Sequence, residues 1–62
     1  MKIRIEAARI NKQLTQDAAA ELIGISKDCL SNYERGKTAP NVKVAQKMAE
    51  VYEVSLDDLI FD

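Results

Sequence analysis

The sequence contains no histidine and no tryptophan, and it has a single cysteine, a single proline and two glycines. Without histidine, the Ser-His and Cys-His pairs that activate nucleophiles cannot form, and a zinc site would have only Cys29 besides carboxylates. Gly24 and Gly36 lie too far apart to build a glycine-rich phosphate loop. We therefore expect a function in binding rather than catalysis, with no metal and no cofactor.

Long apolar runs are also absent. No run approaches the roughly 18 residues that a membrane span needs, and charged residues spread through Met1–Arg9 do not resemble a signal peptide. A lone cysteine makes no internal disulfide, so a reducing cytoplasm is the simplest location. A chain of 62 residues allows one domain, residues 1–62. Such a small domain buries only about 60% of its unfolded surface, which favours support from a dimer or a partner.

The net charge of −1 does not by itself suggest nucleic acid, but the charges are unevenly distributed. All nine lysines and arginines lie in residues 1–49 against five acids, which gives that part +4. The last thirteen residues contain five acids and no base. This polarity permits a basic face at one end of the folded domain.

Apolar spacing and capping residues predict an all-α domain of five helices and no strand. Thr15, Ser26 and Asn41 are suited to cap helices, Ser55 with Asp58 three residues on resembles a capping box, and Gly24 can end a helix in the left-handed conformation. The predicted helices cover Lys2–Lys12, Gln16–Ile23 and Lys27–Arg35, followed by a fourth from Asn41 to Tyr52 and a short fifth from Ser55 to Phe61.

The second and third predicted helices form the most informative pattern, because only a very short turn at Gly24 separates them. Such a turn holds two helices at a steep angle, so one helix can protrude from the surface while the other packs against it and supports it. A helix of this size fits the DNA major groove, which is about 12 Å wide. From this pattern alone, a helical bundle with a solvated polar face is equally consistent.

Specific residues then favour DNA. The run Leu14-Thr15-Gln16, the segment Leu30-Ser31-Asn32-Tyr33-Glu34-Arg35-Gly36-Lys37 and Pro40 closely resemble the XRE/Cro and phage-repressor helix-turn-helix family. The resemblance extends from Arg4 to Ile60 and implies a compact five-helix, lambda-repressor-like domain. It also implies a small cytoplasmic transcriptional regulator, bacterial or phage-encoded, such as a phage or prophage repressor, that binds double-stranded DNA sequence-specifically. A homodimer on a palindromic site is the expected active form.

The resemblance also assigns residue roles. Lys27, Asp28 and Asn32 match base-reading positions, with Ser31 as an additional contact; lysine suits guanine, asparagine suits adenine and aspartate suits cytosine. Arg9 and Glu34 match an ion pair between the first and third helices. The residues expected on DNA phosphates are Gln16, Ser26, Arg35, Lys37, Thr38 and Lys43.

Some positions depart from the family pattern. Gln13 and Glu53 stand where glycine is frequent, so we expect these two turns to be reshaped. Ile3, Ile10 and Leu22 are apolar where polar residues are more usual, and they would form a partner or dimer surface if exposed.

These apolar residues and the acidic total support an alternative function. The chain could be a protein-interaction module that retains the helix-turn-helix fold, antitoxin-like or regulator-binding. Salt dependence separates the two functions, because binding through several phosphates weakens steeply with added salt.

Overall fold

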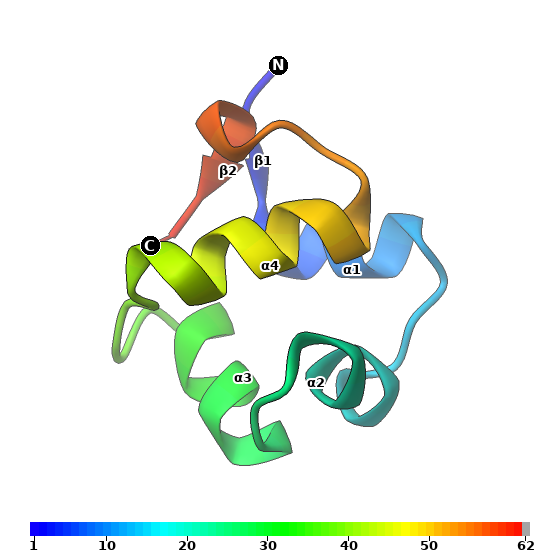
Figure 1. Cartoon of the computed structure of the whole chain (residues 1–62), viewed down its shortest axis with the longest axis vertical. Helices are drawn as coiled ribbons and strands as arrows, with labels where there is room; N and C mark the ends of the chain where they lie inside the picture. The colour runs from blue at the N-terminus through cyan, green and yellow to red at the C-terminus, as the bar shows by residue number, and fades with distance from the viewer. Residues whose placement is uncertain (62) are drawn as a thin grey trace.

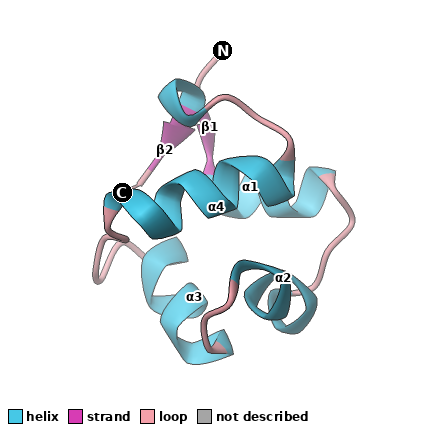
Figure 2. Ribbon diagram, viewed as in Figure 1, coloured by secondary structure: helices cyan, strands magenta, loops and turns pink. Residues whose placement is uncertain are grey.

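The computed structural model describes residues 1–61 of the chain. These residues form four α-helices, α1 (Ile5–Asn11), α2 (Gln16–Ile23), α3 (Lys27–Glu34) and α4 (Val42–Tyr52). A 3₁₀ turn, η1 (Leu56–Asp58), leads into β2 (Leu59–Ile60), which pairs with β1 (Ile3–Arg4). Helices α2 and α3 lie on one side of α4 and the strand pair lies on the other (Figures 1 and 2). Asp62, the last residue of the predicted single domain, lies outside the described residues.

The two ends of the chain differ from the sequence-based prediction. In place of a helix from Lys2 and a fifth helix to Phe61, Ile3 pairs with Leu59 and Arg4 with Ile60 in a parallel register. Ser55 makes no side-chain cap, and the predicted fifth helix is only the turn η1. The physical reason is that β-branched and aliphatic residues at both ends pack well in a pleated pair. Parallel pairing also joins segments that local periodicity cannot relate.

The four helices share one way of ending. Each is followed by a residue in the left-handed region, and the next N–H bonds back to the carbonyl five residues earlier. This long-range hydrogen bond across a left-handed residue is characteristic of the Schellman motif. The left-handed residues are Gln13 (φ 59°), Gly24 (φ 92°), Gly36 (φ 73°) and Glu53 (φ 56°). The expectation of reshaped turns at Gln13 and Glu53 was therefore wrong. Both residues adopt the left-handed backbone conformation, which is strained for a residue with a side chain and unstrained for glycine.

Three of the four predicted N-caps are confirmed, all except Ser55. The Thr15 side chain accepts from the Ala18 N–H at 3.1 Å, and the Ser26 side chain accepts from the Cys29 N–H at 3.1 Å. Asn41 accepts from the Val44 N–H at 2.9 Å. Each cap satisfies one of the orphan donors in a first helical turn. The helices on either side of the Gly24 turn therefore begin where the sequence predicted.

The core lies where the helices meet. Leu30, Met48 and Tyr52 are its largest fully buried side chains, while Ala8 and Ala19 let helices approach closely. Partly buried residues that pack against this core include Ile3, so Ile3 does not belong to an exposed apolar surface. Ile10 and Leu22 are 56% and 55% exposed, as the partner-surface hypothesis requires. Among residues 1–61, no helix has the length and apolarity to cross a membrane.

Candidate nucleic-acid interface

The segment Gly24–Ser26 joins α2 to α3 and sets the direction of the second helix. Gly24 adopts φ 92° and lets the chain leave α2 at once, and Ser26 caps α3 from extended backbone. Ile25 packs against the core between them, and Leu30 is completely buried one turn into α3. The inner side of α3 is thus fixed by packing, which leaves the opposite side of the helix free to face a partner.

The outward face of α3 carries the residues predicted to read bases. Side chains spaced by three, four and seven residues share a helical face, and Asp28, Asn32 and Arg35 have this spacing opposite Leu30. Lys27 and Asp28 are exposed, and Ser31 and Asn32 are half-buried. The four predicted base readers therefore lie on or beside one accessible surface, together with Arg35, which was expected on phosphate.

Arg35 makes a contact that sequence reasoning missed. Its Nη2 donates to the Oδ1 of Asn32 at 2.8 Å. The two residues are three apart at the end of α3, where side chains of adjacent turns meet. Their spacing was the available signal for this contact, but the resemblance had assigned the residues separate roles.

Arg9 and Glu34 join α1 to the last turn of α3. Arg9 Nε donates to Glu34 Oε2 at 2.7 Å, and Arg9 Nη2 donates to Oε1 at 3.3 Å. The side chains are only 11% and 4% exposed. Arg9 Nη1 also donates to the Leu14 carbonyl at 2.8 Å. The hydrogen bond to Glu34 raises the pKa of Arg9 despite burial, so the guanidinium stays charged and holds α3 against α1 and the α1–α2 turn.

Gln16 is the third member of this network. Its Nε2 donates to Glu34 Oε1 at 2.8 Å, a contact that the assignment of Gln16 to phosphate did not anticipate. The bond occupies one amide hydrogen, and it leaves a second donor and the amide oxygen of the side chain. Gln16 also begins α2, where the N–H groups of the first turn favour an anion. Glu34 therefore fixes the side chain that begins α2.

A buried phenol lies behind the same network. Tyr52 is 1% exposed, and its hydroxyl has no hydrogen-bond partner among residues 1–61. Burial raises the pKa of Tyr52 to about 12, the Glu34 charge adds to this effect, and the Arg9 charge opposes it. Tyr52 is therefore neutral at physiological pH and fills the core beneath the ion pair.

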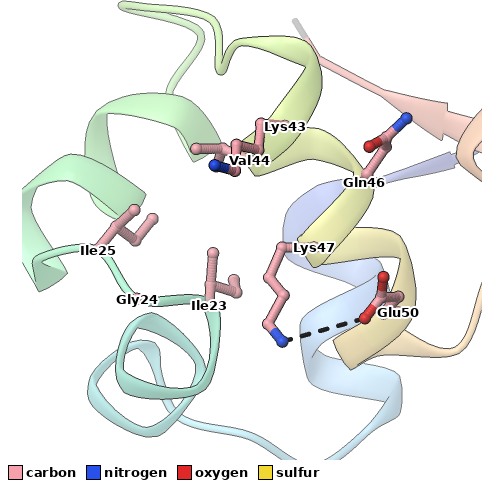
Figure 3. A pocket seen from close by; sticks show the side chains of 8 residues that line it. All are labelled: Ile23, Gly24, Ile25, Lys43, Val44, Gln46, Lys47 and Glu50. Carbon is pink, nitrogen blue, oxygen red and sulfur yellow. Dashed lines mark ion pairs between the residues drawn. The ribbon is translucent and has the colours of Figure 1, made fainter.

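The remaining predicted phosphate contacts surround α3. The Ser26 side chain accepts from the Cys29 N–H, so its hydroxyl hydrogen remains available as a donor. Lys37 and Thr38 are exposed in the loop after α3, and Lys43 is exposed in the first turn of α4. Lys43 also borders a hollow between the α2–α3 turn and α4, with Ile23, Ile25 and Val44 among its lining residues (Figure 3). These four residues lie at both ends of α3 and beside it, rather than in one compact cluster.

Comparison with known proteins agrees with this geometry. The helix-turn-helix family model matches residues 5–59. An uncharacterised HTH-type transcriptional regulator of Archaeoglobus fulgidus is 33% identical over 63 aligned positions, which cover the whole chain and 89% of the relative. The uncharacterised HTH-type transcriptional regulator YazB of Bacillus subtilis is 39% identical over 56 positions, covering 90% of this chain and 81% of YazB.

A further relative is a named repressor. The cryptic phage CTXphi transcriptional repressor RstR of Vibrio cholerae is 30% identical over 59 positions, covering 95% of this chain and 53% of RstR. No solved structure gives a significant match. The names of these relatives favour DNA binding over the protein-interaction alternative. The chain belongs to the XRE-type helix-turn-helix family of DNA-binding transcriptional regulators.

Proposed function

We propose that this regulator acts as a two-fold dimer on a palindromic DNA site, with α3 of each protomer in the major groove. A single helix reads only a few base pairs, and two half-sites about 34 Å apart supply the missing selectivity. Repression is the favoured mode, because RstR is named as a repressor. The cytoplasm, where chromosomal and phage DNA is accessible, is the proposed location.

The outward face of α3 carries this proposal. Lys27 and Asp28 begin the helix and are exposed, while Ser31 and Asn32 follow one turn later. Lysine donates to guanine acceptors, and aspartate accepts from the cytosine amino group. An acid on this face repels phosphate, so Asp28 sharpens base selectivity and weakens affinity for unrelated DNA.

Contacts to phosphate set the register of α3 on the duplex. We assign them to Gln16 and the first turn of α2, to Ser26, and to three exposed residues that follow α3: Lys37, Thr38 and Lys43. Only the two lysines in this set add charge, and charge governs the release of counterions. Arg35, the sixth residue expected on phosphate, lies on the outward face of α3 beside the base readers.

Dimer contacts are proposed for the exposed apolar side chains of Ile10 and Leu22. An exposed isoleucine or leucine gains about 1.5–3 kcal/mol when fully buried, so two such residues on each protomer would contribute usefully to a small interface. Sedimentation of Ile10→Lys and Leu22→Lys with and without duplex DNA tests this role. We expect weaker dimers, and unchanged association would place the dimer contact elsewhere.

Selection from a randomised duplex pool near physiological salt tests the proposed function, with wild type and Asn32→Ala run in parallel. Wild type should enrich a palindrome, and the variant should lose about 1–3 kcal/mol of preference at one position in each half-site. A salt titration accompanies the selection. An equal loss on all sequences would remove Asn32 from the base readers. Absence of enrichment would instead contradict sequence-specific binding.

A further inference from the structure

We propose that Asn32 and Arg35 act together as one base-reading unit that presents hydrogen-bond donors and therefore selects guanine. This inference rests on the proposed function and makes it more specific. Sequence reasoning assigned Asn32 to adenine and Arg35 to phosphate. The contact between the two side chains changes both assignments.

The outward direction of Arg35 is the first step. Asp28, Asn32 and Arg35 follow one another at intervals of four and three residues on the side of α3 opposite Leu30, which is fully buried. Arg35 keeps right-handed helical backbone angles of φ −84° and ψ −1° as the C-cap of α3. Its side chain therefore continues the row of base readers.

The orientation of the Asn32 amide is the second step. A guanidinium has five N–H donors and no acceptor, so only the amide oxygen of asparagine can bond to it. Arg35 Nη2 lies 2.8 Å from Asn32 Oδ1, which turns the Asn32 NH₂ group away from Arg35. The pair thus exposes the two Asn32 amide hydrogens and the remaining guanidinium hydrogens, all of which are donors.

This arrangement is poorly suited to adenine. Reading adenine requires asparagine to accept from the N6 amino group while it donates to N7. Here the accepting oxygen is already bound to a cation, which crowds and repels an incoming amino group. Guanine instead presents two major-groove acceptors, N7 and O6, and this edge matches a row of donors.

Phosphate is the other partner that a row of donors can bind. Asp28 argues against it, because this exposed acid lies one turn before Asn32 on the same face. Phosphate oxygens on that face would be repelled by the carboxylate. The Asp28 carboxylate can instead accept from a cytosine amino group in a neighbouring base pair. The outward face of α3 is therefore better matched to base edges than to the DNA backbone.

Selection from a randomised duplex pool tests this inference, with wild type, Arg35→Gln and Lys37→Gln compared. The two variants remove one positive charge each from exposed residues two positions apart, so they form a matched pair. Wild type should require guanine at one position per half-site. Arg35→Gln should lower that preference about 5- to 150-fold, which is the discrimination of one good bidentate contact. Lys37→Gln should weaken binding to DNA and leave the preference for guanine unchanged.

Three results would overturn the inference, and each is distinct. A wild-type preference for adenine at the position that relaxes in Asn32→Ala would show that Asn32 reads its base alone. An unchanged consensus with equal weakening on all sequences in Arg35→Gln would make Arg35 a phosphate contact. A wild type that enriches no sequence would contradict the proposed function itself and the inference with it. Circular dichroism of each variant verifies that the fold is retained.

Discussion

Replacing Arg9 with methionine should strongly destabilise the fold, because the change leaves the Glu34 carboxylate buried without its cation. Glu34 is 4% exposed and accepts two hydrogen bonds from Arg9, at 2.7 and 3.3 Å. After the substitution it would keep only the bond from Gln16 at 2.8 Å. Methionine preserves much of the apolar stem, so the lost contribution is that of charge and hydrogen bonding rather than volume.

The expected loss is large relative to the stability of so short a chain. Removing one partner of a buried ion pair costs about 3–5 kcal/mol, whereas a chain of 62 residues has a total stability of roughly 3–9 kcal/mol. Arg9→Lys should lower the free energy of unfolding by only about 1–2 kcal/mol. Lysine keeps the charge but lacks the planar guanidinium that donates to Glu34 and to the Leu14 carbonyl at the same time.

Urea unfolding followed by circular dichroism measures these losses, with trimethylamine oxide added to fold the weakest variant. The double variant Arg9→Met/Glu34→Leu removes both charges and should recover more than half of the loss. Arg4→Met is the matched control, because Arg4 is exposed in β1. It should change stability by no more than about 0.5 kcal/mol.

Two results would refute this reasoning. A cost below about 1 kcal/mol for Arg9→Met would place the pair among solvent-exposed ion pairs, which contribute little. A double variant no more stable than Arg9→Met would show that the loss comes from altered packing and not from an uncompensated charge. Either result would remove the ion pair as the main link between α1 and α3.

Three further predictions concern strain, the buried phenol and phosphate contacts. Gln13→Gly should raise stability by about 0.5–1 kcal/mol in urea unfolding, because glycine relieves the left-handed strain; Glu53→Gly should gain less, because it also loses the exposed Lys12 ion pair. Ionisation of Tyr52 should cost wild type about 2–3 kcal/mol of folding stability between pH 10 and 12, because burial raises the folded pKa of Tyr52 to about 12 from its ordinary value of about 10. Tyr52→Phe should remove the part of the alkaline loss that comes from Tyr52, and its neutral-pH stability should be unchanged or up to about 1 kcal/mol higher. Lys37→Ala should weaken binding to every duplex and reduce the salt slope by about 1 per protomer; a changed base preference would contradict its assignment to phosphate.

The middle of the fold was predictable because its signals are local. Thr15, Ser26 and Asn41 satisfy N–H groups only three residues ahead, and helix α2 has the predicted bounds while α3 differs by one residue at its end. The chain ends were not predictable in this way. The partners of Ile3 and Arg4 lie more than fifty residues away, so no helical or strand periodicity within one segment reveals them.

For the candidate site, the sequence predicted the positions of the residues but not the contacts between them. Family resemblance placed individual residues on α3 and around it, and the exposed fractions of those residues agree with surface roles. It did not reveal contacts between them, such as Gln16 with Glu34 or Asn32 with Arg35. Such contacts depend on side-chain rotamers and on competition among several donors for one acceptor. Position in a motif therefore predicts where a residue lies better than what it binds.

The net charge of −1 is compatible with DNA binding because opposite charges are separated and partly paired. Acids of the C-terminal part pair with cations from elsewhere, including Glu53 with Lys12 at 2.7 Å and Asp58 with the N-terminal amine at 3.3 Å. Among residues 1–61, the lysines at both ends of α3 and at the start of α4 form no ion pair; these are Lys27, Lys37 and Lys43.

The arrangement of the fold determines which of these charges DNA encounters. The strand pair and η1 lie across α4 from α3 (Figure 1), in a molecule that extends 27 Å along its longest axis. Electrostatic interactions in physiological salt are screened over about 8 Å, so a duplex at α3 responds mainly to the nearby lysines. At 0.01 M salt the screening length grows to about 30 Å, and the acidic end then opposes association. The local surface of α3, rather than the total charge of the chain, therefore governs affinity under cellular conditions.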